Sequence, residues 1–260
     1  EPGNVDLGSA GQIEVVRGPL SYFYGSTALS GIVQITTRRG TAEKPQVRAS
    51  VDGGGNALVR GDAPVAGMAG GGDYYLGFDW EQQTGNVGDD DFQQANVQGS
   101  YMVPVREAAT LRLSTRVASW EADDYPESSG GPVFGSGDLR HAEATELSVG
   151  ADLNWSTSDR WRNRFTTTYY RRSMERDSPG VFPLVPPSVE ATSYWHLRSG
   201  WLSTYDLSTG ARVSAGLDID HENGNNVSTL FLPPFFGGNV SGDYVLSRTT
   251  PGTFLEATAS

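Results

Sequence analysis

A period-two alternation of apolar and polar residues runs through most of this chain and limits the folds open to it. In the segment 73–81, the apolar positions Tyr74, Leu76, Phe78 and Trp80 are separated by Tyr75, Gly77, Asp79 and Glu81. Successive side chains of a β-strand point to opposite sides, so each alternating segment is predicted to be a strand with one apolar and one polar face. The pattern recurs at 46–52, 94–103, 111–117, 146–155, 161–170, 195–205 and 212–220.

The length of these segments favours a membrane barrel over a soluble sheet. A strand that crosses a bilayer needs about ten alternating residues, with one face toward lipid and the other toward a wet interior. Strands of soluble sheets usually have about five or six residues. The sequence has no run of eighteen apolar residues, which excludes a transmembrane helix, and its 37% hydrophobic content and 33 glycines suit a barrel. The predicted fold class is therefore all-β, an antiparallel transmembrane β-barrel.

The connectors between predicted strands alternate in length. Short connectors are expected at 67–72, 104–110, 156–160 and 206–211, and long loops at 83–93, 121–144, 173–190 and 223–252. Short turns on one side and long loops on the other are typical of the periplasmic and extracellular ends of outer-membrane barrels. Trp155, Trp161, Trp201 and Tyr205 lie near the short connectors, where they are expected to form an aromatic girdle at headgroup depth. The alternative is an aromatic core beneath a soluble sheet.

Residues 11–40 have a different residue pattern from the long alternating segments in the rest of the chain. Two short β-branched runs, at 13–16 and 32–36, are bounded by Gly and Pro, which predicts two buried strands. The connector contains Gly18-Pro19 and Tyr24-Gly25-Ser26. Glycine adds backbone freedom and proline fixes φ, so the connector is expected to hold one shape. These residues alone predict a small β/loop module without an assigned use.

The order IEVVRGP, YGS and GIVQITTRRG closely resembles the C-terminal end of the plug domain in TonB-dependent outer-membrane receptors. The matching positions, expected to be structural, are Arg17, Gly18, Pro19, Tyr24, Gly25, Ser26 and Gly31. Receptors of that family close a 22-stranded barrel around the plug. The resemblance thus implies that 1–40 is the C-terminal part of a plug, 41–45 a hinge, and 46–260 the first nine to ten barrel strands. On this interpretation the chain is a fragment of a longer protein.

The resemblance also implies a function without chemistry on the ligand. Such receptors take up scarce, bulky molecules, namely siderophores, haem, cobalamin or oligosaccharides. They act in the bacterial outer membrane, among its lipid and lipopolysaccharide, with a TonB-type energising protein in the periplasm. The family uses the arginine that corresponds to Arg17 in ion pairs with barrel carboxylates. The alternative is a smaller outer-membrane barrel, an enzyme or an adhesin, without a functional plug.

Two sets of residues are candidates for binding. Exposed aromatic residues in loops often mark a binding surface, and the ligand candidates are Tyr22, Tyr24, Tyr125, Phe134, Phe182 and Phe235. The alternative is that they pack loop against loop. Calcium prefers clustered carboxylate oxygens, and cobalamin receptors of this family use loop aspartates in that way. The calcium candidates are Asp89, Asp90, Asp91, Asp123 and Asp124, with solvated loop charge as the alternative.

Composition argues against several other classes of function. The net charge of −12 is opposite to the basic footprint that nucleic acids require. The sequence has no cysteine, which excludes disulfides and thiol metal sites. It also lacks the HExxH, P-loop and GxSxG motifs, and its three histidines, His141, His196 and His221, are widely separated. We therefore expect no enzymatic activity, and no cofactor other than calcium at the aspartates named above.

Overall fold

The computed structural model describes residues 10–18, 31–37, 39–85, 90–125, 138–181 and 185–259. Within these ranges almost every element is a β-strand, and no helix is long and apolar enough to cross a membrane. The all-β antiparallel prediction is confirmed. The strands are β1 (Ala10–Arg17), β2 (Gly31–Thr37), β3 (Gln46–Val47), β4 (Ser50–Gly53), β5 (Val59–Asp62), β6 (Val65–Ala69), β7 (Gly72–Thr84), β8 (Asp91–Arg106), β9 (Ala109–Asp124), β10 (Arg140–Ser158), β11 (Trp161–Ser178), β12 (Ser188–Ser208), β13 (Ala211–Leu230), β14 (Val240–Ser241) and β15 (Tyr244–Ala259).

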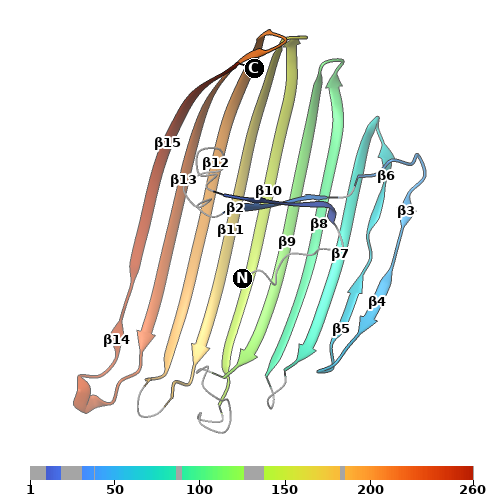
Figure 1. Cartoon of the computed structure of the whole chain (residues 1–260). Helices are drawn as coiled ribbons and strands as arrows, with labels where there is room; N and C mark the ends of the chain where they lie inside the picture. Colours follow the sequence, from blue (N-terminus) through green and yellow to red (C-terminus); the bar gives the residue numbers. More distant parts are fainter. Residues whose placement is uncertain are drawn as a thin grey trace.

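The strands from β3 onward form one antiparallel sheet in which chain neighbours lie side by side (Figure 1). β3 with β4 and β5 with β6 each make one interrupted strand, and β15 pairs with β13. Two-residue turns join β6 to β7, β8 to β9, β10 to β11 and β12 to β13, all at the same end of the sheet (Figure 1). We call this the turn end and the opposite one the loop end.

The two sides of the sheet differ in polarity, as the alternation predicts. Side chains at odd positions of β8–β13 and even positions of β7 lie on what we call the apolar face. This face exposes large apolar side chains; for example, Leu76 is 54% exposed and Leu217 is 54% exposed. The other side, the polar face, carries most of the charged residues and the buried Asp79, Asn96 and Glu146. The described residues therefore form a wall with one hydrophobic surface rather than a two-layer soluble core.

β1 and β2 form a separate antiparallel hairpin in which Arg17 pairs with Gly31. This confirms the two strands predicted on either side of the Gly-Pro connector. The hairpin runs across the direction of the barrel-type strands (Figure 1). Val15 and Val33 are each 62% exposed, so the apolar residues of these strands are not buried within the described part of the chain.

The segment that leads from the hairpin into the sheet is anchored at the turn end. Arg39 donates hydrogen bonds to both carboxylate oxygens of Asp73 of β7, the shortest at 2.7 Å. Gly40 is buried, and a Cβ atom placed on it would lie 2.2 Å from the backbone oxygen of Gly67. The backbone N–H of Met68 donates to the carbonyl of Ala42 at 3.0 Å. The expected hinge at 41–45 thus directly follows a close contact between the backbones of Gly40 and Gly67. We call this contact the joint at Gly40.

The strands at the loop end are longer than the sequence pattern predicts. The expected loops 83–93, 121–144, 173–190 and 223–252 are too wide, because β7, β9, β11 and β13 extend to Thr84, Asp124, Ser178 and Leu230. The following strands begin correspondingly early. The physical reason is that the backbone ladder continues where the apolar alternation stops. Glu121 and Glu143 face each other there on the same side as the apolar residues below them.

Candidate functional site

Two belts of aromatic residues border the apolar face. At the turn end, Trp161 pairs with Tyr205 across β11 and β12, and the Trp161 indole N–H donates to Ser203 Oγ at 2.8 Å. Toward the loop end, the Tyr169 and Trp195 ring centroids are 6.3 Å apart. Trp195 and Tyr205 are ten positions apart on β12, or about 33 Å of extended strand. If the strand is tilted by roughly 40° from the membrane normal, this length spans an apolar band of about 25 Å, as in outer-membrane barrels.

This arrangement fits aromatic girdles at the two edges of a bilayer. We refer to Trp155, Trp161, Trp201 and Tyr205 as the turn-end belt, which the sequence predicts, and to Trp80, Tyr169 and Trp195 as the loop-end belt. The loop-end belt was missed because its members lie on three separate strands without a short connector beside them.

The polar face carries a network of hydrogen bonds and ion pairs across β7 to β11. Asn96 donates to Asp79 at 2.8 Å, and Arg116 donates to Asn96 at 2.7 Å. Arg116 also approaches Glu146 at 3.5 Å, and Arg172 approaches the second Glu146 oxygen at 3.7 Å. Glu146 is 8% exposed, so its carboxylate is stabilised mainly by these two guanidinium groups. The network ties five neighbouring strands together at one level.

A pocket of about 550 Å³ lies on the polar face toward the loop end, between β12, β13 and β15. Gly224 forms the floor of this pocket. The space above Gly224 is open, because a Cβ atom placed on it would have only Tyr194 within 4 Å, at 3.7 Å. Tyr194 donates to Glu222 at 3.0 Å, and Arg248 pairs with the other Glu222 oxygen at 2.6 Å. Tyr244 and Leu246, exposed to 54% and 66%, line the pocket as well. An aromatic, a cation and an aliphatic group thus surround a space of ligand size.

Few of the ligand candidates predicted from the sequence fall on described residues. Tyr22, Tyr24, Phe134 and Phe182 lie outside them, as do Pro19, Gly25 and Ser26 of the plug motif. Tyr125 directly follows β9 and is half-buried. Phe235 is 80% exposed and stacks on Phe236, with ring centroids 4.0 Å apart. The ligand role of these residues, like the ion pair of Arg17 with a barrel carboxylate, stays a prediction.

The carboxylates proposed for calcium have different neighbours. Asp124 accepts a 2.7 Å hydrogen bond from Arg140, and Asp123 contacts His141 at 2.8 Å. Asp91 lies opposite Asp123 in the β8–β9 register, whereas Asp89 is outside the described residues. Within the described ranges, no group of three or more acidic or histidine side chains is arranged to hold a metal. Calcium binding through these five aspartates stays a prediction.

His141, at the loop end of β10 and beyond the aromatic belt, gives a pH-dependent contact. The hydrogen bond with Asp123 is the largest cause that raises its pKa above 6.5; desolvation opposes it, and the charges of Asp123, Glu121 and Glu143 add to it. A pKa raised by folding means that the contact stabilises fully below about pH 6.5 and is lost as the pH rises through the folded pKa. Because both side chains are partly exposed, the effect is about 0.5 kcal/mol or less.

The measurement for this contact is unfolding of the protein in detergent between about pH 6 and 8, compared with His141→Gln. The wild type is expected to lose slightly more stability than the variant over this range. Identical pH profiles would contradict the role given to His141 and Asp123.

Comparison with solved structures shows what the fold resembles. The siderophore receptor PiuA from Acinetobacter baumannii matches with a TM-score of 0.71 and 12% identity, over 96% of this chain and 44% of that one. The ferripyoverdine receptor of the outer membrane of Pseudomonas aeruginosa matches with a TM-score of 0.78 and 11% identity, over 95% and 39%. The copper transporter OprC matches with a TM-score of 0.73 and 14% identity, over 96% and 40%.

No protein-family model matches the chain, and no curated protein matches its sequence. The chain spans less than half the length of the three structures named above. Nearly all of the chain is covered in each case. The antiparallel wall, its two aromatic belts and these structural matches together show that this chain has the fold of part of an outer-membrane receptor.

Proposed function

We propose that the chain is part of a TonB-dependent receptor that takes up a scarce, bulky small molecule through the bacterial outer membrane. The observation that carries this proposal is the wall with one apolar and one polar face, bordered by aromatic belts, in a fold shared with outer-membrane receptors. The polar face would line the lumen, and the β1–β2 hairpin would belong to the plug inside it. No covalent step on the ligand is involved.

A metal chelate of the siderophore type is the ligand class we favour. The structural neighbours include receptors for siderophores and a copper transporter, which supports such a chelate over haem, cobalamin or an oligosaccharide. A smaller barrel enzyme or adhesin is less consistent with matches that extend over nearly the whole chain to receptors. The partners in this proposal are a periplasmic energising protein and the surrounding outer-membrane lipid and lipopolysaccharide.

Uptake of an iron-loaded siderophore mixture by cells, with and without the receptor gene, tests the function. Cells with the receptor are expected to accumulate iron, and removal of the energising protein should abolish uptake while surface binding persists. Binding without any energy-dependent uptake would contradict the transport proposal.

The pocket at Gly224 is the part of the lumen wall proposed to contact the ligand. Tyr244→Ala removes an exposed ring that offers contact area with little cost to the sheet. We expect ligand affinity to fall about tenfold, since aromatic anchors dominate such contacts. Thr258→Ala on the same face of β15, near the turn end, is the matched control. Equal affinities of the two variants would remove the pocket from the binding surface.

A further inference from the structure

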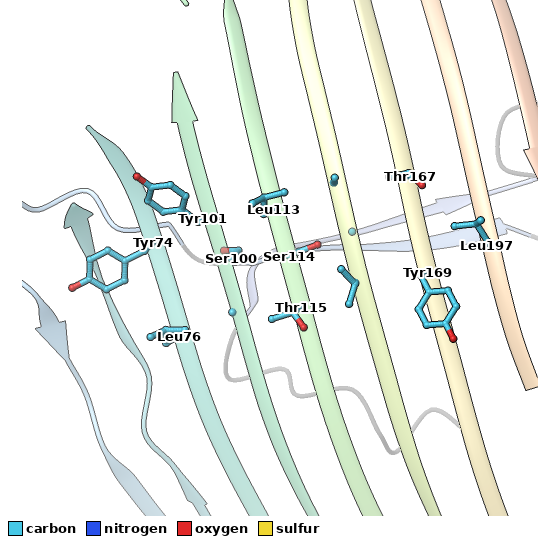
Figure 2. Close-up of a pocket in the computed structure, with 14 residues that line it drawn as sticks. Tyr74, Leu76, Ser100, Tyr101, Leu113, Ser114, Thr115, Thr167, Tyr169 and Leu197 are labelled. Atoms are coloured by element: carbon cyan, nitrogen blue, oxygen red, sulfur yellow. The ribbon is translucent and has the colours of Figure 1, made fainter. Parts of the chain in front are cut away.

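The apolar face contains a groove of about 660 Å³, on the side of the sheet opposite the ligand pocket. Figure 2 shows the residues that line this groove. It crosses six strands, from Tyr74 and Leu76 of β7 to Leu197 of β12. The floor is formed by residues in two neighbouring rows of the sheet. Gly99 pairs with Thr115 in the row nearer the loop end, and Ala151 pairs with Thr167 in the row nearer the turn end. The groove therefore runs obliquely across the strands.

Larger side chains border this groove on both sides. Tyr101 and Leu113, which pair across β8 and β9, lie toward the turn end, and Val149 and Tyr169, which pair across β10 and β11, lie toward the loop end. The hydroxyl of Thr167 is hydrogen-bonded to Ser199 Oγ at 2.9 Å. It therefore needs no hydrogen-bond partner from a molecule bound in the groove. The lining is almost wholly apolar, which suits a hydrocarbon chain and offers nothing to orient a polar ligand.

The position of the groove identifies the environment that fills it. It lies between the two aromatic belts, at the depth that the proposed function assigns to hydrocarbon, and its loop-end border reaches the belt at Tyr169. Lipid tails are as apolar as leucine, so burial alone favours no particular occupant there. A bound acyl chain is favoured by dispersion contacts with the atoms that line the groove, because these contacts would be lost if the groove were unfilled.

A cationic side chain, Arg171, lies near the loop-end border of the groove, where the headgroup of a lipid bound in the groove would be. Arg171 lies two positions beyond Tyr169 on β11, about 7 Å along the strand. It is exposed and pairs with Leu147 and Trp195, which places it on the apolar face at the level of the loop-end belt. Glu143 and Glu175, which pair with each other on that face, lie four positions further out, about 13 Å away. The charge nearest the belt on β11 is therefore positive.

We propose that the groove and Arg171 together bind one phosphate-bearing lipid of the extracellular leaflet. One acyl chain lies over Gly99, Thr115, Ala151 and Thr167, and the phosphate accepts hydrogen bonds from the Arg171 guanidinium. Arginine is well suited to that contact, because its planar fork matches phosphate oxygens. The inference rests on the proposed membrane placement.

The test uses lipopolysaccharide as the probe and the full receptor purified from outer membranes. Bound lipid A is quantified by native mass spectrometry after detergent exchange. Ala151→Phe fills the groove, and Arg171→Ala removes the cation. Gly99 is left unchanged, because a Cβ atom there would lie 3.0 Å from Leu76 Cδ2. Ala215→Phe, on the apolar face of β13 outside the groove, and Arg164→Ala, on the polar face, are the matched controls.

We expect about tenfold weaker lipid A retention in Ala151→Phe and in Arg171→Ala, and wild-type retention in both controls. Equal retention in all five proteins would overturn the site, and so would an equal loss in test and control variants. Retention of phospholipid in place of lipid A, with the same dependence on Ala151, would overturn the assignment to the extracellular leaflet. Failure of the wild type to appear in the outer-membrane fraction would instead reject the proposed function.

Discussion

Replacing Gly40 with valine is expected to prevent most of the receptor from assembling. The Cβ atom of any residue at this position would lie 2.2 Å from the Gly67 oxygen and 2.3 Å from the Gly67 nitrogen. Both are backbone atoms of a paired strand, so no side-chain rotation relieves the contact. Relief requires the 39–42 segment to separate from β6, which breaks the Met68–Ala42 hydrogen bond and the Arg39–Asp73 ion pair.

We expect the free energy of unfolding to fall by about 3 kcal/mol or more, because of this overpacking and the loss of the contacts at the joint. Gly55→Val is the matched control, because nothing lies within 4 Å of a Cβ atom at Gly55. The measurement is the fraction of heat-modifiable, folded receptor in outer membranes. Similar folded fractions for the two variants would show that the contact at Gly40 does not hold the 39–42 segment against β6.

Truncating Glu146 to alanine is expected to give the second large effect. Glu146 is buried and faces Arg116 and Arg172, so its removal leaves two guanidinium groups without their shared carboxylate. Breaking a buried ion pair by removing one partner costs about 3–5 kcal/mol. Because the network spans five strands, the loss should appear as a lower unfolding midpoint of the whole barrel in detergent.

Asp206→Ala provides the comparison for Glu146. Asp206 also bridges two arginines, Arg162 and Arg212, each at 2.7 Å, but it does so near the turn end with both partners about half exposed. Exposed ion pairs contribute little to stability, so the midpoint should change far less. A midpoint that falls as much in Asp206→Ala as in Glu146→Ala would contradict the special role of the buried carboxylate.

The faces of the strands could be predicted from the sequence because period-two alternation depends only on local residue order. His196 illustrates both the reach and the limit of this reasoning. Its place on the polar face follows from alternation, but its hydrogen bond to Asp220 depends on the β12–β13 register. The same holds for Glu222 and Arg248, whose pairing is set by the span between β13 and β15. The pocket at Gly224 could therefore not be derived from the sequence.

The ends of the strands were predicted less well for a different reason. Beyond the loop-end belt the sheet leaves hydrocarbon, and residues such as Glu121 and Glu143 replace apolar ones without ending the hydrogen-bonded ladder. A pattern that detects strands by their apolar face must lose them there. The joint at Gly40 was also missed, because close approach of two backbones leaves no signal beyond the presence of glycine.

Cysteine accessibility along β12 is the most direct test of the two-faced wall. These 260 residues contain no cysteine. In a full receptor whose remaining residues are also free of cysteine, single substitutions at His196, Arg198 and Gly200 on the polar face and at Leu197, Ser199 and Trp201 on the apolar face report individually. With the full receptor in outer membranes and a water-soluble maleimide, the three even positions are expected to react and the three odd positions to be protected by lipid. Equal labelling of odd and even positions would contradict a membrane-spanning wall with a wet interior.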